Sequence, residues 1–333
     1  MLSRMDHPNI IRSIEFGKSQ DRYFIVLEHI WGESLTTLCA LCHKRGLSFP
    51  LDAALYVGAG IADALDHAHS RVDPEGAPAP IIHRDVTINN VMLTYEGGLK
   101  VVDFGLAKTS GRLSHTDMNQ IKGTLVYLAP EQLVIGKDGP ATDIYQLGVL
   151  LYKLTVGREP VAASNMEELV QAVMRGSILK PSARVANFPK PVEMVLMTAL
   201  ARKPERRFKS AADFAAALRD LISPEFKEGP RELQVLLDRL AGDRRESQAR
   251  MISQLLRREG IDATNAELLA RSDGKDEPKE VPAEISGLFP RASDPGLGSP
   301  AASVMRAEPE DDAEDEDEDG PDQTPPLPTP LQV

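Results

Sequence analysis

The sequence predicts an α+β fold, in which short β-strands lie near the N-terminal end and most of the chain is α-helical. Apolar runs of strand length occur at 10–16, at 23–28 and within 81–103. Elsewhere, apolar residues recur at the three- and four-residue spacing of helices that bury one face. The stretch 308–319 holds ten carboxylates and no base. We therefore expect a mostly helical domain with a small β part, a helical extension and a disordered tail.

Composition limits the classes of partner. The formal net charge is −12, and the ten acids of 308–319 leave −2 for the rest of the chain. The charge therefore predicts no nucleic-acid surface. Two cysteines provide no disulfide framework, and no apolar run has the length of a membrane span or the pattern of a secretion signal. We expect a cytoplasmic protein with no membrane span.

The segment 81–103 carries the chemistry that organises the chain. Two apolar runs bracket a polar loop, which reads His-Arg-Asp-Val-Thr-Ile-Asn-Asn from residue 83 to residue 90. Asp85 and Asn90 lie on this loop, and Asp103 ends the next strand-like run, before Phe-Gly. Three oxygen-bearing side chains can therefore converge on one pocket, and oxygen atoms are the ligands that magnesium prefers.

Further motifs follow in a restrictive order. Gly-Thr-Leu-Val-Tyr-Leu-Ala-Pro-Glu spans 123–131, Asp143 opens an apolar helical run, and Lys-Pro-Glu-Arg-Arg-Phe spans 203–208. Taken together, this order resembles the bacterial serine/threonine protein kinases of the eukaryotic-like family, over about residues 1–222. The resemblance implies a protein kinase-like fold, with a remnant of the β-rich small lobe at 1–30 and a mostly helical large lobe at 31–222. The helical extension would then cover 223–270 and the acidic, Pro-rich tail 271–333.

The resemblance also implies roles for the polar loop. Asp85 would accept the proton of a serine or threonine hydroxyl on a protein substrate, and Asn90 and Asp103 would hold Mg²⁺ that bridges the phosphates of ATP. Thr124 resembles the threonine that hydrogen-bonds the catalytic aspartate. Thr87 stands where most such kinases carry a lysine that contacts the γ-phosphate, and its alternative role is to bond its own backbone as a loop residue.

Three residues are expected around the adenine of ATP. Glu28 and Ile30 belong to a stretch that resembles the hinge between the lobes, which would bond the adenine edge through its backbone. The plain alternative is a strand end that enters a loop. Met92 resembles the floor under the adenine ring. His83 and Phe104 resemble the stacked pair that links the two lobes.

Other residues are expected to support or regulate the site. Glu131 and Arg207 resemble a buried ion pair, and Asp143 resembles the aspartate that holds the backbone of the catalytic loop. Arg84 is typical of kinases that are controlled by phosphates in the activation loop, which would pair with its guanidinium. The hydroxyls that could carry such a phosphate are those of Thr109, Ser110, Ser114 and Thr116.

The main departure from the family pattern lies at the N-terminal end. The Gly-rich loop, the lysine of the third strand and the glutamate of the helix after it are not found in the 333 residues. A two-stranded hairpin at 10–28 would expose an open edge and an apolar face. We therefore expect the natural protein to begin upstream of Met1, the alternative being a genuine truncation. An active kinase and a catalytically inactive pseudokinase that acts as a binding or scaffold protein both remain open.

The remaining elements follow from periodicity. Helices are expected at 32–44, 51–70, 147–154, 166–175, 191–201 and 211–221, and the Pro- and Gly-containing stretch 71–80 is expected to be a surface loop. Cys39, Cys42 and His43 match a pattern for haem attachment, but two small apolar residues on a helix face are the favoured interpretation.

The extension at 228–259 shows leucines at helical spacing, with a break expected at Gly242. Two interpretations are equally good. The extension either docks on its own kinase lobe, or binds a partner or a second copy, with the acidic tail as a further candidate surface. In that tail, Pro-Pro-Leu-Pro at 325–328 gives a weak polyproline pattern.

Overall fold

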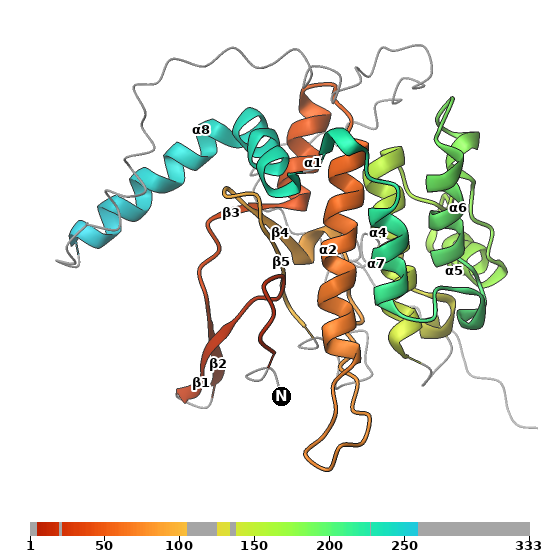
Figure 1. The fold of residues 1–333 in the computed structure, drawn as a ribbon, viewed down its shortest axis with the longest axis horizontal. Coiled ribbons are helices and arrows are strands. Elements are labelled where there is room, and N and C mark those ends of the chain that lie inside the picture. The colour runs from red at the N-terminus through yellow and green to blue at the C-terminus, as the bar shows by residue number, and fades with distance from the viewer. Residues whose placement is uncertain (1–4, 20–21, 105–124, 134–137, 227, 259–333) are drawn as a thin grey trace, which may run out of the picture. The chain divides into compact units, whose positions relative to one another are not determined.

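The computed structural model describes residues 5–19, 22–104, 125–133, 138–226 and 228–258, and the elements named below lie within these ranges. Two small antiparallel sheets accompany a set of α-helices (Figure 1). The first sheet pairs β1 (Ser13–Ser19) with β2 (Arg22–Leu27). The second has the order β3 (Gly32–Ser34), β4 (Val91–Thr94) and β5 (Leu99–Val101). The predicted α+β class is confirmed.

The β1–β2 hairpin carries the exposed apolar face that the sequence predicts. Its first strand begins at Ser13 rather than at Ile10, because Ile10 is buried and forms a parallel bridge with Val101 of β5. Phe16 and Tyr23 stack on each other with ring centroids 5.7 Å apart, and both rings are exposed. The other exposed apolar side chains on these strands are Ile14, Phe24 and Val26.

The helix expected at 32–44 is shorter than predicted. Its first three residues form β3, and α1 covers Leu35–Lys44. Two contacts explain the boundary. The Ser34 hydroxyl accepts a hydrogen bond from Thr37 N and caps the helix. Gly32 lies so close to β4 that a Cβ atom would meet the Leu93 carbonyl oxygen at 2.1 Å, so the strand pairing depends on a glycine there.

The core of the helical part forms around α2 (Leu51–His69), which packs against α4 (Pro140–Val156) and α7 (Ala211–Arg219) (Figure 1). Every residue of α4 from Thr142 to Tyr152 is buried, as expected for a helix that is covered on all faces. Gly157, with φ of +73°, ends it in the left-handed conformation that glycine adopts without strain. Helices α5 (Met166–Arg175) and α6 (Lys190–Ala199) also lie where predicted, with ends shifted by one or two residues in α6.

One buried carboxylate in α6 gives a pH-dependent contribution to stability. Glu193 accepts hydrogen bonds from Lys190 and from Ser182 N, and these lower the pKa of its carboxyl from 4.5 to about 2. In the folded state the Glu193 carboxylate is therefore harder to protonate than in the unfolded chain. Its contribution to the stability of the fold is present above about pH 4.5 and is lost as the pH falls towards about 2.

We expect Glu193→Gln to be less stable than the parent at neutral pH, with a difference that narrows below about pH 4.5. Urea midpoints of parent and variant between pH 7 and pH 3, in steps of about half a unit, measure this difference. The matched control is Glu75→Gln, whose carboxylate lies exposed on the loop after α2. A difference that stays constant over this range would contradict the assigned hydrogen bonds.

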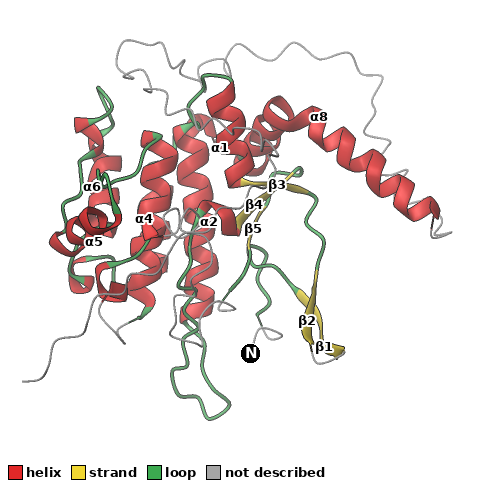
Figure 2. Ribbon diagram, turned by 180° about the vertical axis from the view of Figure 1, so that it is seen from behind, coloured by secondary structure: helices red, strands yellow, loops and turns green. Residues whose placement is uncertain are grey.

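The extension forms α8 (Gly229–Arg258), which has a non-helical residue at Ala241, one position before the predicted break. Its first half is docked on the preceding domain, close to α1 and α2 (Figure 2). In the second half, Met251 and Leu255 are exposed. The docking prediction is thus confirmed for the first half, whereas binding of a partner by the second half stays a prediction. The buried residues of the docked half are Leu233, Leu236, Leu237, Leu240 and Ala241.

Helices in the described ranges do not combine the length and apolarity that a membrane crossing requires. The predicted tail at 271–333 and the end of the predicted extension lie outside the described residues.

Candidate active site

The polar loop predicted to be catalytic lies between α2 and β4, and hydrogen bonds to side chains of α4 hold its backbone in place. Asp143, in the first turn of α4, accepts hydrogen bonds from His83 N and Arg84 N, both at 2.8 Å. His69 Nε2, at the end of α2, lies 2.7 Å from the same carboxylate, which is fully buried. Because unpaired buried backbone N–H groups are costly, this carboxylate determines the path of the loop. The predicted contact between Asp143 and the loop backbone is confirmed.

Gln146 provides a second clamp that sequence reasoning missed. Its amide oxygen accepts from Val86 N at 2.9 Å, and its amide nitrogen donates to the Arg84 carbonyl at 2.7 Å. Gln146 thereby holds both sides of Asp85. The available signal was a single amide in the middle of an apolar helix, one turn after Asp143 and so on the same face.

The clamps hold a strained backbone. Arg84 has φ of +68° and Asp103 has φ of +60°, in the left-handed region that non-glycine residues seldom adopt. Such residues persist where the surroundings determine them fully, and they cluster at functional sites. Arg84 meets this condition because its backbone N–H and C=O are both bonded to α4.

Asp85 and Asn90 form one unit at the centre of the loop. The Asn90 amide nitrogen donates to the Asp85 backbone carbonyl at 2.8 Å and to its Oδ2 at 2.9 Å. The Asp85 side chain is half-buried and can be reached from solvent. Within the described part of the chain, the amide oxygen of Asn90 has no hydrogen-bond partner. That oxygen is therefore available to a cation.

Asp103 is joined to this unit through the backbone. Val102 N donates to the Asn90 carbonyl at 2.9 Å, so Asp103 follows directly after a contact with the loop. Its side chain is exposed and makes no hydrogen bond to another described residue. The structure thus brings the three predicted oxygen-bearing side chains onto two hydrogen-bonded segments. The amide oxygen and the carboxylate are donors of the kind that Mg²⁺ takes when phosphates complete its coordination.

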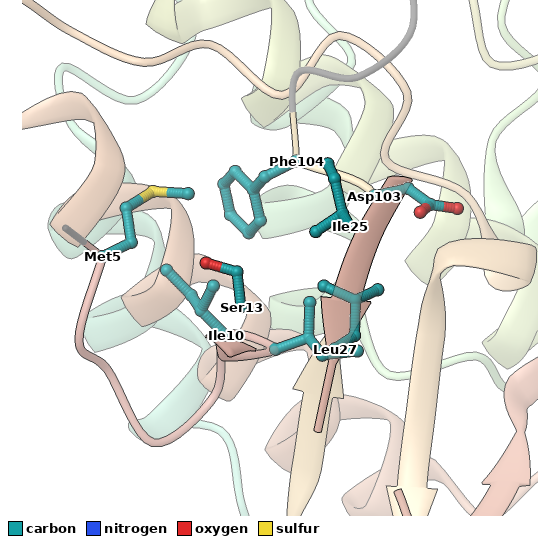
Figure 3. Close-up of a pocket in the computed structure, with 8 residues that line it drawn as sticks. Met5, Ile10, Ser13, Ile25, Leu27, Asp103 and Phe104 are labelled. Carbon is teal, nitrogen blue, oxygen red and sulfur yellow. The ribbon is translucent and has the colours of Figure 1, made fainter. Parts of the chain in front are cut away.

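The predicted stacked pair is present next to these residues. The rings of His83 and Phe104 have centroids 4.5 Å apart, and His83 Nε2 lies 3.0 Å from the Val102 carbonyl oxygen. Phe104 also lines an apolar pocket of about 20 Å³ together with Met5 and Ile25 (Figure 3). That volume holds about one water molecule. The Asp103 carboxylate points away from this apolar group (Figure 3).

The residues predicted around adenine lie on two segments, Glu28 and Ile30 directly after β2 and Met92 in β4. The side chain of Glu28 accepts from Lys100 Nζ at 2.7 Å and from Arg12 N at 2.9 Å; partial burial raises the pKa of this carboxyl, but the two hydrogen bonds outweigh it and lower the pKa. Ile30 makes no backbone hydrogen bond to another described residue, so its N–H and C=O are available. Met92 is half-buried in β4. Their contact with adenine stays a prediction.

Thr87 has a local role. Its side chain is buried, and its hydroxyl accepts from Asn89 N at 3.3 Å, which caps the short 3₁₀ helix Ile88–Asn90. This is the alternative in which the threonine bonds its own backbone, and a contact with the γ-phosphate stays a prediction.

The predicted regulatory residues are described in part. Arg84 Nε lies 3.1 Å from Asp138 Oδ2, and both side chains are about one-third exposed. Thr124 and the four hydroxyls predicted to carry phosphate, those of Thr109, Ser110, Ser114 and Thr116, lie outside the described residues.

The thiols of the two cysteines on α1 are not activated as nucleophiles or metal ligands. Burial raises the pKa of the Cys39 thiol to about 11 and that of the Cys42 thiol to about 12, so both stay protonated at neutral pH. Cys42 packs in the hydrophobic core, whereas His43 is exposed. This agrees with the interpretation as apolar residues on a helix face. No three His, Cys, Asp or Glu side chains in the described ranges are grouped to hold a metal.

Comparison with known protein families gives a match that includes all the residues of the candidate site. The sequence model of the family described as "Protein kinase domain" matches residues 1–223. The Tyrosine-protein kinase MasK of Myxococcus xanthus is 34% identical over 223 residues, which are 67% of this chain and 34% of that protein. The Serine/threonine-protein kinase PrkC of Bacillus subtilis is 32% identical over 219 residues, which are 65% of this chain and 32% of that protein. The chain thus spans about a third of the length of these relatives.

A solved structure shows the same fold. The crystal structure of Rad53 residues 1–466 in complex with AMP-PNP superimposes with a TM-score of 0.52 and 24% sequence identity. The match covers 67% of this chain and 53% of that chain. At this identity the likeness concerns the fold alone.

Proposed function

This chain belongs to the protein kinase family, with bacterial kinases of the eukaryotic-like kind among its relatives, and we propose that it transfers the γ-phosphate of ATP to serine and threonine hydroxyls of proteins. We also propose that residues 31–222 form the large lobe, that 1–30 belong to the small lobe and that the extension runs over 223–270. The observation that carries the proposal is the Asp85–Asn90 unit on a loop clamped by Asp143 and Gln146.

The proposed mechanism assigns the proton to Asp85. Its carboxylate would accept a hydrogen bond from the substrate hydroxyl and then its proton, while the Asn90 amide nitrogen keeps the carboxylate in one orientation. The Asn90 amide oxygen and the Asp103 carboxylate would hold Mg²⁺. When bound, ATP would supply the phosphoryl group, and Mg²⁺ would neutralise the charge that develops on it.

The other predicted residues complete the proposal. Backbone groups of Glu28 and Ile30 and the side chain of Met92 would hold adenine, and Thr124 would hydrogen-bond Asp85. A phosphate on the activation segment would have to compete with Asp138 for the Arg84 guanidinium, which makes that ion pair a candidate for control.

The preference for serine and threonine rests on Thr124 and on the names of relatives, one of which is named a tyrosine-protein kinase. Phosphoamino-acid analysis tests it. The protein, purified from its native cells and weighed intact, is incubated with Mg²⁺ and γ-labelled ATP, with and without a mixed protein substrate. We expect label on serine and threonine.

Two results would overturn the proposal. Label on tyrosine alone would remove the serine/threonine assignment and keep the kinase. The absence of both transfer and ATP binding would favour the inactive pseudokinase, which acts as a binding protein. The intact mass relates either result to the chain that the cell makes, because the Gly-rich loop and the family's ATP-anchoring lysine are not found in these 333 residues.

A further inference from the structure

A buried carboxylate outside the catalytic loop gathers three donors. Glu33 of β3 is 3% exposed, and its Oε1 accepts from Tyr95 Oη at 2.9 Å. The same oxygen accepts from Arg244 Nε at 2.7 Å and from Gln248 Nε2 at 3.1 Å. Two of the three donors come from α8, which lies beyond the family match at residue 223.

The burial of the Glu33 carboxylate depends on this arrangement. A buried carboxylate is strongly destabilising unless a cation and hydrogen bonds replace water around it. Arg244 supplies the cation, and its hydrogen bond to Glu33 raises the pKa of the guanidinium. The neighbouring Arg245 lies over the face of the Tyr95 ring, 5.6 Å from its centroid, and pairs with Asp238. The second half of α8 is therefore tied to β3 and Tyr95 by polar contacts.

The first half of α8 brings these donors into position. The docked leucines of α8 pack with α1 and α2, and the Arg45 guanidinium donates to the Arg239 carbonyl. The start of α8 also packs closely against the turn between β4 and β5. Gly97, with φ of +82°, leaves no room for a Cβ atom, which would meet the Pro230 carbonyl oxygen at 1.7 Å. The non-helical backbone at Ala241 then redirects the helix one turn before Arg244.

Glu33 lies on the strand between the two parts of the proposed adenine site. It comes three residues after Ile30, and β3 pairs with β4 so that Ser34 is opposite Met92. Tyr95 N donates to the Trp31 carbonyl at 3.0 Å, and the two rings meet edge to face with centroids 5.4 Å apart. A shift of Glu33 would therefore move the segment after Ile30 relative to Met92.

We propose that Arg244 and Gln248 are positioning residues that hold β3 against β4 through Glu33, so that α8 sets the geometry of the adenine side of the nucleotide site. This inference rests on the proposed function for its consequence in ATP binding. The hold of α8 on β3 is independent of that function and is tested separately.

The test compares Arg244→Met with the parent in the full chain. The first readout is amide hydrogen exchange of residues 31–34 and 91–95 without nucleotide, and the second is the Kd for AMP-PNP with Mg²⁺. We expect faster exchange in both segments and binding weaker by about three- to tenfold, since the variant leaves a buried carboxylate without its cation. Arg244→Lys keeps the positive charge, so we expect its exchange rates and its Kd for AMP-PNP to stay close to those of the parent.

The matched control is Arg250→Met on the same helix, because the contacts that Arg250 makes with described residues, Glu246 and Ser247, lie within α8. Exchange in β3 and β4 that is the same in Arg244→Met, Arg250→Met and the parent would overturn the inference. So would faster exchange with an unchanged Kd, since Glu33 would then have a purely structural role. If the parent binds no nucleotide, the proposed function fails, and the exchange readout alone decides whether α8 holds β3.

Discussion

Asp85→Asn is expected to lower the rate of phosphate transfer by about 10²- to 10⁴-fold, the usual contribution of a positioned general base. The substitution removes the group that takes the proton and preserves its shape. The described contacts of the Asp85 side chain are confined to the hydrogen bond from Asn90 Nδ2, which an amide oxygen can also accept. We therefore expect a melting temperature within about 2 °C of the parent.

The measurement is the initial rate of transfer from γ-labelled ATP, together with thermal unfolding of the same samples. Asp73→Asn is the matched control. Asp73 lies on the loop after α2, where its carboxylate accepts from Glu75 N and Ala77 N, and an amide oxygen can again replace it. Equal rates for the parent and Asp85→Asn would remove Asp85 as the base. A large loss of stability in Asp85→Asn would instead make it a structural residue.

The resemblance to protein kinases predicted the contact between Asp143 and the backbone of the polar loop, and the structure gives its physical reason. Asp143 is a buried carboxylate in a mostly apolar helix, so it needs hydrogen-bond partners, and the loop backbone provides them. The same reasoning applied to Gln146 would have found the second clamp, because a buried amide also requires partners on both its oxygen and its nitrogen.

Element boundaries were predicted less well because distant residues set them. Ile10 reads as the start of a strand, but its bridge to Val101 removes it from β1. Gly32 reads as the start of a helix, but pairing with Thr94 makes it part of β3. Neither partner can be identified from periodicity, which reports only the local pattern of burial.

The hydrogen-bond network around Glu33 could not be predicted from the sequence. Glu33 and Arg244 are 211 positions apart, and a lone glutamate and an arginine on an amphipathic helix are both expected in solvent. The leucines of α8 predicted a helix with one buried face, but not which surface covers it. The buried leucines all precede the non-helical residue Ala241, whereas Met251 and Leu255, which follow it, are exposed.

The ion pair between Glu131 and Arg207 leads to the largest expected change in stability. Arg207→Met is expected to lower the free energy of unfolding by about 3–5 kcal/mol, because it leaves a buried carboxylate without its cation. The Arg207 guanidinium donates to the two carboxylate oxygens of Glu131 at 2.6 and 2.8 Å and to the Ala141 carbonyl at 2.7 Å, and it lies 4.8 Å from the centroid of the Tyr145 ring. After the substitution, Thr142 Oγ1 is the remaining described donor to Glu131.

Urea unfolding of four proteins measures this effect: the parent, Arg207→Met, the double variant Glu131→Gln/Arg207→Met, and Arg219→Met as the control. Arg219 pairs with Asp63 at the surface, where an ion pair contributes about 1 kcal/mol or less. The double variant is expected to recover part of the lost free energy of unfolding, since it also removes the unpaired negative charge of Glu131.

A loss in Arg207→Met no larger than that in Arg219→Met would show that water reaches Glu131. A loss of the expected size without recovery in the double variant would assign the stability to the bonds from Arg207 to the carbonyls of Ala141 and Ala201. Either result bears on the candidate site, because Glu131 accepts a hydrogen bond from Thr142, and the next residue, Asp143, holds the loop that carries Asp85. Stability at this ion pair and the geometry around Asp85 are therefore expected to change together.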